Sequence, residues 1–223
     1  MNGPKLVIFD LDGTLIDTVA LVVGAFSFAF EQMEMVVPDE KSIRATSGLS
    51  THIAIKRLAP EANDEDLEKL LTIYRNEYIA KTVVSMREPL FVGARHALDK
   101  LNGRDDFLLA VATGKPMRGV NRVMQAHDLA EFFTSLQTPD DNISKPHPDM
   151  INKAMARVGV QKRQTVMIGD TSHDMEMAVN AGVGAIGVDW GYHEVEELET
   201  AGADIVVSDF DQLLAAIDKM TEV

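Results

Sequence analysis

Short apolar runs recur along the chain, and each is followed by a stretch with helical periodicity. The runs that we predict to be strands are Leu6–Phe9, Phe107–Ala112, Val166–Ile168, Ala185–Val188 and Asp204–Val207. Apolar strands that alternate with helices are typical of a parallel sheet covered on both faces. The pattern therefore predicts an α/β fold with a mostly parallel sheet and helices on both of its faces.

Residues that favour helix ends support this alternation. Pro116 and Pro148 suit the first turn of a helix, where the missing N–H removes no hydrogen bond. Asp170-Thr171-Ser172 offers capping oxygens before an amphipathic run that ends at Gly182. We expect helices to begin at these three places.

One long stretch departs from the alternation. From about Asp17 to about Ser85 only helical periodicity is present, and the clearest helix is Asp64–Val84. Its predicted apolar face consists of Leu67, Leu70, Leu71, Tyr74 and Tyr78. We predict a helical insertion after the first strand, with Ser85–Leu90 as the return linker. The predicted division is an α/β core of residues 1–16 and 86–223 and a helical domain of residues 17–85.

Composition narrows the classes of partner. The 223 residues contain 21 Lys and Arg against 35 Asp and Glu, which gives a formal net charge of −14. This charge argues against a nucleic acid or an anionic membrane as partner. The chain has no cysteine, so disulfides and thiol nucleophiles are excluded. No apolar run reaches the roughly 18 residues of a membrane span, and no signal core follows a basic segment, so we expect a cytoplasmic protein.

Two aspartates stand together at the end of the first predicted strand, in Phe9-Asp10-Leu11-Asp12-Gly13-Thr14. Carboxylates this close repel each other unless a cation or a proton offsets them, which suggests a divalent metal beside a reactive carboxylate. We interpret Asp10 as a nucleophile that attacks phosphorus and forms an acyl phosphate. Asp12 is placed to protonate the leaving oxygen and then to deprotonate the attacking water. A helix cap at a βα turn is the structural alternative for Asp10.

A second acidic pair follows a later strand, in Gly169-Asp170-Thr171-Ser172-His173-Asp174. We interpret Asp170 as a direct metal ligand that joins Asp10 and Asp12, and Asp174 as a residue that holds a metal-bound water or orients the site. An all-oxygen ligand set suits Mg²⁺. The alternative is a doubly capped helix start.

Phosphate ligands are expected at the same edge of the sheet, since ligands of open α/β sheets bind outside the carboxyl ends of the strands. The hydroxyl of Thr113 and the backbone N–H of Gly114 would bind phosphate oxygens at a helix N-terminus. Lys145 supplies a positive charge for the nucleophile and the transferring phosphoryl group. Taken singly, a lysine before proline is typical of a solvated loop.

These segments, in this order, resemble the haloacid dehalogenase-like superfamily. The matching motifs are Asp10-x-Asp12-Gly13-Thr14-Leu15, Thr113-Gly114, Lys145-Pro146 and Gly169-Asp170-x-x-x-Asp174, which run through nearly the whole chain. The resemblance implies a Rossmann-like core, an aspartyl-phosphate intermediate and Mg²⁺. It also implies that the helical insertion is a small cap that closes over the substrate and selects it.

Finer features are similar to the phosphoglycolate phosphatase-like branch of that superfamily. They are Gly13-Thr14-Leu15-Ile16-Asp17-Thr18, Lys145-Pro146-His147-Pro148-Asp149, Trp190-Gly191-Tyr192 and Ala201-Gly202-Ala203-Asp204. The resemblance implies Mg²⁺-dependent hydrolysis of a small phosphorylated metabolite of the phosphoglycolate type. Related phosphoglycolate enzymes often read Thr-Asn-Lys-Pro where this chain has Thr113-Gly114-Lys115-Pro116. We therefore expect phosphate binding to survive and finer substrate contacts to differ.

Two other functions stay open at this point. A sugar phosphomutase of the same superfamily keeps both aspartates, whereas a dehalogenase has no leaving oxygen to protonate and no use for Asp12. A non-catalytic binding module is the third class, and the presence of Asp10, Asp12, Lys145 and Asp170 counts against it. Activity on a generic aryl phosphate would separate an enzyme from a binding module.

The cap is expected to select the substrate. Arg44, Ser47 and Lys56 are the candidate cap contacts, with solvated helix charges as the alternative for the two cations. Phosphoglycolate, pyrophosphate, a sugar phosphate and a nucleotide monophosphate are all compatible with the motifs. We expect a monomer or a homodimer.

Overall fold

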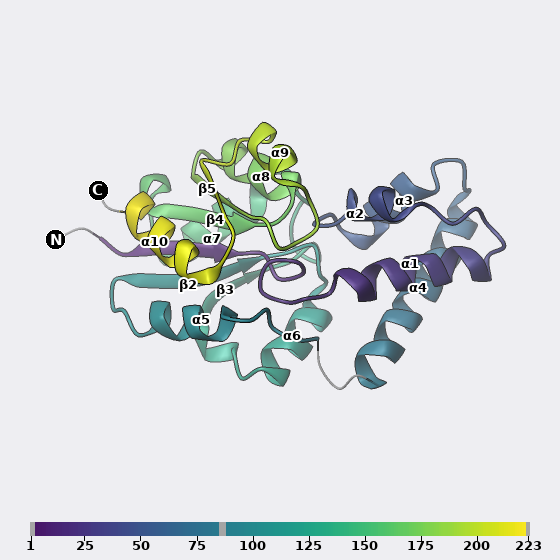
Figure 1. Cartoon of the computed structure of the whole chain (residues 1–223), viewed down its shortest axis with the longest axis horizontal. Helices are drawn as coiled ribbons and strands as arrows, with labels where there is room; N and C mark the ends of the chain where they lie inside the picture. The colour runs from purple at the N-terminus through teal and green to yellow at the C-terminus, as the bar shows by residue number, and fades with distance from the viewer. Residues whose placement is uncertain (1–2, 85–87, 222–223) are drawn as a thin grey trace.

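A six-stranded parallel sheet forms the centre of the computed structural model, which describes residues 3–84 and 88–221 (Figure 1). The strand order is β3-β2-β1-β4-β5-β6, and every neighbouring pair is parallel. The strands are β1 (Lys5–Phe9), β2 (Phe107–Ala112), β3 (Phe133–Gln137), β4 (Thr165–Gly169), β5 (Gly184–Val188) and β6 (Ile205–Val207). The expected α/β fold with a parallel sheet is confirmed.

The first strand lies at the middle of the sheet. Leu6 of β1 pairs with Leu108 of β2 on one side and with Thr165 of β4 on the other. Residues 6–9 are fully buried, as their unbroken apolar sequence requires. The carboxyl ends of β1, β2 and β4 therefore lie side by side, and the polar residues that follow these strands share one edge.

Helices cover both faces of the sheet. The helices α5 (Ala94–Asn102), α6 (Met117–Ala126) and α10 (Phe210–Thr221) pack against one face, and α7 (Asp149–Val158) and α8 (Ser172–Ala181) pack against the other. Shorter elements are α9 (Val195–Thr200), η1 (Ala130–Phe132) and η2 (Lys162–Gln164). Each face has its own apolar core, so the sheet is a rigid support for the loops at its carboxyl edge.

The helical insertion lies beyond that edge (Figure 1). It contains α1 (Val19–Gln32), α2 (Glu40–Arg44), α3 (Thr51–Leu58) and α4 (Asp64–Val84), so the predicted helix and its bounds are confirmed. These helices form a separate apolar core around Phe30, Ile43 and Leu70. The predicted boundary at Ser85 and the first part of the linker Ser85–Leu90 lie outside the described residues.

Two details differ from the sequence analysis. The strand β3 was not expected, because Thr134, Ser135 and Gln137 break its apolar pattern, as an edge strand tolerates. Pro116 and Pro148 each precede the first residue of a helix rather than occupying its first turn. The shift is one residue, within the usual variation of helix bounds.

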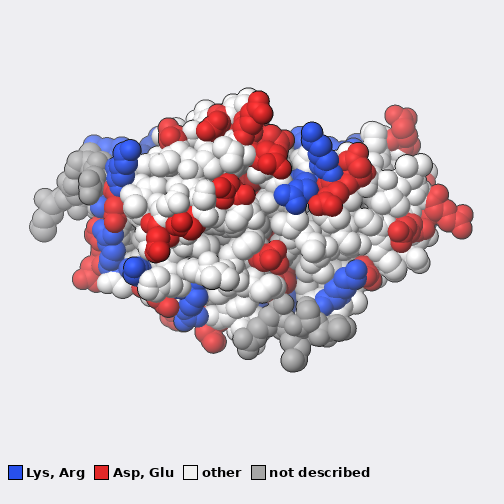
Figure 2. Space-filling view, viewed as in Figure 1, with Lys and Arg blue, Asp and Glu red and all other residues white. Residues whose placement is uncertain are grey.

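Helix hydropathy and surface charge bear on the expected partners. No helix among residues 3–84 and 88–221 is long and apolar enough to cross a membrane. On the face shown in Figure 2, acidic and basic side chains are interspersed, and acidic ones occur over both the sheet domain and the helical insertion. That nucleic acid is not a partner stays a prediction.

Candidate active site

The turn after β1 places Asp10 at the centre of the carboxyl edge. Asp10 is 1% exposed. Its Oδ1 accepts a hydrogen bond of 2.7 Å from the Leu11 N–H, and its Oδ2 lies 2.9 Å from Lys145 Nζ. The chain turns at Gly13 with φ of 86°, where a Cβ would lie 2.2 Å from Asp170 Oδ2. Only glycine allows this approach of the turn to the acidic residue after β4.

Three buried carboxylates surround one lysine. Oxygen atoms of Asp10, Asp170 and Asp174 lie within 4.8 Å of one another. Lys145 Nζ, which is fully buried, contacts Asp10 and also lies 2.5 Å from Asp174 Oδ1. The oxygens of Asp170 accept hydrogen bonds from the Thr14 hydroxyl (2.7 Å) and the Tyr192 N–H (2.9 Å).

Burial shifts the titration of these groups. It raises the pKa of the Asp10 carboxyl to about 6, against the effect of the Lys145 charge and with a contribution from Asp174. Burial, followed by the charges of Asp10 and Asp174, raises the pKa of Asp170 well above its usual value. For Lys145, burial lowers the pKa, but the two carboxylates outweigh it and raise the pKa overall. One buried ammonium thus leaves the carboxylates short of positive charge.

We expect Asp10→Asn to become more stable relative to the parent as the pH rises from about 4 to about 6 without metal. The folded pKa of Asp10 lies above its unfolded value of 3.8. Its favourable contribution is therefore complete below pH 3.8 and is lost as the pH passes through about 6. Asparagine does not titrate, so the free energies of unfolding should separate by about 3 kcal/mol. Urea unfolding with EDTA measures this, and a constant difference would contradict it.

Asp12 takes a different position from Asp10. Its carboxylate lies 2.8 and 2.9 Å from Lys115 Nζ and accepts a hydrogen bond of 3.1 Å from the Thr18 hydroxyl. Lys115 also lies 2.8 Å from Glu88 and donates a hydrogen bond of 2.9 Å to the Tyr78 hydroxyl oxygen. The side chain of Asp12 is therefore held by a lysine and is not part of the metal-ligand cluster in this structure.

The Lys115 network joins the sheet domain to the insertion. The Tyr78 hydroxyl, from α4, donates a hydrogen bond to Glu88, and Arg122 of α6 lies 3.2 Å from the second oxygen of Glu88. Burial alone would lower the pKa of Lys115, but the charges of Asp12 and Glu88 raise it, so the lysine is a permanent cation. Its charge is already balanced by two carboxylates.

A cavity opens between the sheet edge and the insertion. It is lined on the sheet side by Asp10, Asp12, Thr113 and Gly114, and Ser47 lines it from the insertion. The Thr113 hydroxyl accepts a hydrogen bond of 3.2 Å from the Lys115 N–H. The structure thus brings both candidate catalytic aspartates and two of the three predicted phosphate ligands to one cavity, with Lys145 directly beneath Asp10.

The segment before α3 packs closely on the turn after β2. A Cβ at Gly114 would lie 2.5 Å from the Leu49 carbonyl oxygen and 2.6 Å from that of Gly48. The Ser50 N–H donates a hydrogen bond of 3.0 Å to the Ser144 hydroxyl. Gly114, the departure noted in the sequence, therefore makes room for the insertion to lie against the site.

Two predicted cap contacts lie elsewhere. Arg44 donates hydrogen bonds to the carbonyl oxygens of Gly191 (2.9 Å) and Tyr192 (3.0 Å), so it joins α2 to the loop after β5. Lys56 is exposed on α3 and does not line the cavity. Of the three predicted cap contacts, only Ser47 lines the cavity.

Sequence reasoning missed several residues of the site. Tyr192 was given no role in the site, yet its N–H donates to Asp170, and its side chain lines the cavity. Lys115 and Glu88 were given no role. A lysine directly after Thr113-Gly114 was the available signal for Lys115, whereas nothing in the sequence relates Glu88 to Asp12.

The acidic cluster fits a divalent cation. Its donors are carboxylate oxygens, each fixed by at least one partner, which is the ligand type that Mg²⁺ prefers. Three carboxylates and one ammonium leave two uncompensated negative charges in a buried place. Asp10 and Asp170 would hold the ion directly. Asp174, which lies beside Lys145, is close enough to add a further carboxylate oxygen to the site.

Known sequences and structures are similar to this chain over most of its length. The sequence profile described as haloacid dehalogenase-like hydrolase matches residues 7–188. The chain is 36% identical over 214 residues to a Dickeya dadantii (strain 3937) protein named probable phosphatase IndB, over 95% of this chain and 92% of the relative. It is 28% identical over 221 residues to the phosphoglycolate phosphatase of Vibrio vulnificus (strain CMCP6), over 96% of each chain.

A solved structure of similar fold covers the same length. It is the crystal structure of a predicted phosphatase from Clostridium acetobutylicum, with a TM-score of 0.84 and 26% identity. The superposition covers 98% of this chain and 100% of the other. The similarity therefore includes both the sheet domain and the helical insertion.

Proposed function

The chain belongs to the haloacid dehalogenase-like hydrolase family and is a phosphatase, and from this premise we propose that it is a Mg²⁺-dependent phosphomonoester hydrolase. The reaction would proceed through an aspartyl-phosphate on Asp10, with a small phosphorylated metabolite as substrate. Phosphoglycolate is one candidate, since relatives that are 25–28% identical are named phosphoglycolate phosphatase. The cytoplasmic location stays a prediction.

One observation carries the proposal: Asp10 and Asp12 line the same cavity with their carboxylates in different electrostatic settings. Asp10 is buried beside Lys145, while Asp12 is 24% exposed at its side chain and paired with Lys115. A nucleophile and a separate proton carrier are what two-step phosphoryl transfer needs. The pair at one cavity therefore supports this chemistry better than a capping role.

Each of these side chains has a defined part in the proposed reaction. An oxygen of Asp10 attacks phosphorus, and the bond between phosphorus and the alcohol oxygen breaks. Asp12 gives a proton to the leaving alcohol and then takes one from the water that hydrolyses the acyl phosphate. The Thr113 hydroxyl and the Gly114 N–H bind phosphate oxygens. The positive charge of Lys145 stabilises the negative charge of the nucleophile and of the transferring phosphoryl group.

A divalent cation would neutralise the phosphate and the carboxylates when bound. Asp10 and Asp170 are the proposed direct ligands, and Asp174 positions Lys145 and the start of α8. Its Oδ2 accepts hydrogen bonds from the N–H and the hydroxyl of Thr171, which closes a capping box. This capping role was the structural alternative for Asp174, and here it coexists with a place beside the cluster.

We further propose that residues 17–85 act as a cap over the site. The insertion has its own apolar core and reaches the sheet domain through polar contacts such as those of Arg44 and Ser50. Such a contact surface is compatible with opening and closing, because few apolar side chains need to separate. A closed cap excludes water while the substrate reacts.

Gly114→Ala is expected to lower kcat/KM by roughly 10- to 100-fold while leaving the free energy of unfolding nearly unchanged. The added methyl group would meet two carbonyl oxygens of the 48–49 segment, so the cap could not reach its position. Phosphate release and urea unfolding measure the two effects. Gly24→Ala is the control, since its Cβ would meet only Lys81 Nζ at 3.4 Å. Activity equal to the parent would show that cap position does not depend on Gly114.

The proposed function is tested by phosphate release from a panel of phosphorylated metabolites, with Mg²⁺ and with EDTA. Phosphoglycolate, several hexose phosphates and a nucleotide monophosphate cover the candidate classes. Release that depends on Mg²⁺ is the expected result. A folded protein that releases no phosphate from any compound would overturn the proposal, and interconversion of sugar phosphates without release would identify the phosphomutase alternative.

A further inference from the structure

The cavity above Asp10 and Asp12 continues into the insertion, where its lining becomes apolar. The side chains that line this part are Val22, Phe26, Leu49, Ala54, Tyr74 and Ile79, which we call the apolar wall. They come from α1, α3, α4 and the segment before α3. The alcohol part of a phosphate ester bound at Asp10 has to extend along this wall.

Two aromatic rings stand in the apolar wall, and a third lies beside them. The rings of Phe26 and Tyr74 are stacked, with centroids 4.2 Å apart and planes at 26°. Tyr78 continues the row, with its ring centroid 5.9 Å from that of Tyr74. A row of aromatic side chains favours a flat ring as ligand, because rings gain from offset or edge-to-face contacts as well as from burial.

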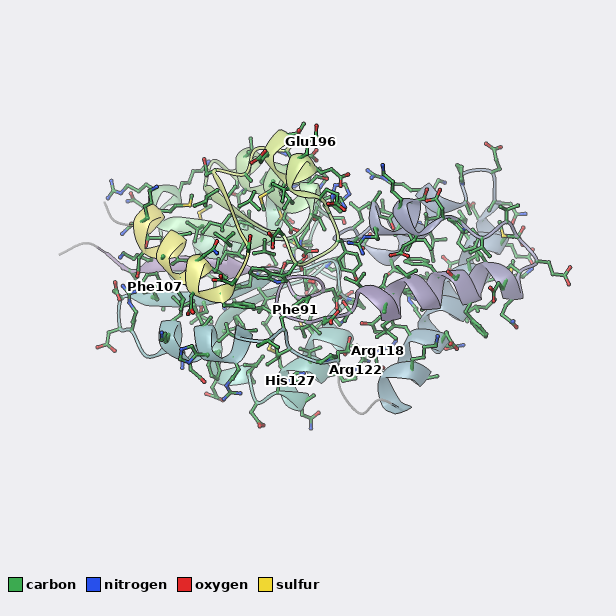
Figure 3. All side chains as sticks on the ribbon, in the orientation of Figure 1. Phe91, Phe107, Arg118, Arg122, His127 and Glu196 are labelled. Carbon is green, nitrogen blue, oxygen red and sulfur yellow. The ribbon has the colours of Figure 1, made fainter. Side chains whose placement is uncertain are left out.

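The cations near the apolar wall do not favour a substrate whose small alcohol part carries a carboxylate. Lys115 is balanced by Asp12 and Glu88, and Arg122 is paired with Glu88. Arg75 and Arg118 line the cavity and form no ion pair within residues 3–84 and 88–221, but both are exposed. Figure 3 shows Arg118 and Arg122 on the side of α6 that is turned toward the insertion. A carboxylate two bonds from the phosphate oxygen would therefore be desolvated without a free buried cation.

One polar group on the wall is available to a ligand. The Tyr74 hydroxyl makes no hydrogen bond to the described part of the chain, although its ring lines the cavity. By contrast, the Tyr78 hydroxyl is held by Glu88 and Lys115. A ring with a polar substituent could therefore receive a hydrogen bond from Tyr74 while it packs on Phe26.

We propose that the substrate is a phosphate monoester whose alcohol carries an apolar, flat ring. The inference rests on the proposed phosphatase function and names its substrate class. The step is ester hydrolysis: the bond between phosphorus and the alcohol oxygen breaks, water supplies the new phosphate oxygen, and the ring alcohol leaves with a proton. No further reactant is needed.

The test compares benzyl phosphate, ethyl phosphate and phosphoglycolate at saturating Mg²⁺. Benzyl alcohol and ethanol are alcohols of similar acidity, so a difference in kcat/KM between their esters reports on the ring rather than on the leaving group. We expect benzyl phosphate to exceed both other esters by at least tenfold. Equal values, or a preference for phosphoglycolate, would overturn the ring assignment.

A variant separates the wall from the general chemistry. Tyr74→Gln removes one aromatic face from a half-buried position, and it is expected to reduce the benzyl-to-ethyl ratio of kcat/KM at least fivefold. Asn76→Ala is the control, because Asn76 is exposed on the same helix and does not line the cavity. An unchanged ratio in a folded Tyr74→Gln variant would contradict the role of the wall.

Acetyl phosphate distinguishes failure of the inference from failure of the proposed function. It is a reactive phosphate compound without a ring, so an active phosphatase is expected to hydrolyse it. Hydrolysis of acetyl phosphate with no preference for benzyl phosphate would leave the phosphatase in place and reject the ring. No hydrolysis of any of the four compounds by folded protein would reject both.

Discussion

Asp10→Asn is expected to reduce kcat by about 10⁴- to 10⁶-fold, the loss typical of removing a catalytic nucleophile. An amide cannot form the acyl phosphate, whereas its size is nearly the same, and its oxygen can still accept the hydrogen bond from the Leu11 N–H. The loss should appear in kcat, because the proposed phosphate contacts of Thr113 and Gly114 remain. Phosphate release at saturating substrate measures it.

The controls for this prediction address folding and contamination. Asp10→Asn should unfold at least as late in urea as the parent at pH 7, since it removes a buried carboxyl with a raised pKa. Asp211→Asn, at an exposed position of α10, should keep the parent rate. Mass spectrometry excludes deamidation back to aspartate. Substantial turnover by pure Asp10→Asn would mean that another group attacks phosphorus.

The sheet and the helices were predictable because their signals are local. Unbroken apolar runs define β1 and β4, since a central parallel strand is buried on both faces. The period of Leu67, Leu70, Leu71, Tyr74 and Tyr78 defines α4 in the same way. The edge strand β3 was not predictable, because an edge strand needs no continuous apolar sequence.

The candidate site was predictable in its motif residues and not in its pairings. Asp10, Thr113 and Asp170 follow apolar strands, so their common edge is a consequence of parallel topology. The contact between Asp12 and Lys115 joins residues 103 positions apart. It depends on where the turns after β1 and β2 direct their side chains, which no local pattern states.

Cap residues were the hardest to place for a related reason. Arg44 and Lys56 are cations on amphipathic helices, and the sequence alone does not say how those helices are oriented toward the sheet domain. The structure directs Arg44 to the carbonyl oxygens of residues 191 and 192 and leaves Lys56 exposed. Phe26 and Tyr74 of the apolar wall were not predicted to line a cavity for the same reason, because both rings also fit the core of a helical domain.

Lys145→Met is expected to lower the free energy of unfolding by about 3–5 kcal/mol at pH 7 without metal, as expected when one partner of a buried ion pair is removed. Lys145 Nζ contacts both Asp10 and Asp174, so its loss leaves three buried carboxylates with no ammonium among them. Methionine has a similar length and keeps most of the packing. Urea unfolding with EDTA measures the change, and Lys219→Met at an exposed position of α10 should stay within about 0.5 kcal/mol of the parent.

The sign of the pH dependence identifies the cause. Without the lysine, Asp10 loses the charge that opposes its protonation, so its carboxyl group stays neutral to higher pH. The loss of stability should therefore be smaller near pH 4 than at pH 7. A loss that is independent of pH would indicate missing packing rather than missing charge.

A double variant tests whether Lys145 stabilises the fold through Asp10. Asp10→Asn removes one of the carboxylates that Lys145 compensates, so adding it to Lys145→Met should recover part of the lost stability. The coupling between the two substitutions is then favourable and of the order of 1–3 kcal/mol. Strict additivity would mean that Lys145 does not stabilise the fold through Asp10, and the charge of the site would have to be balanced through Asp174 alone.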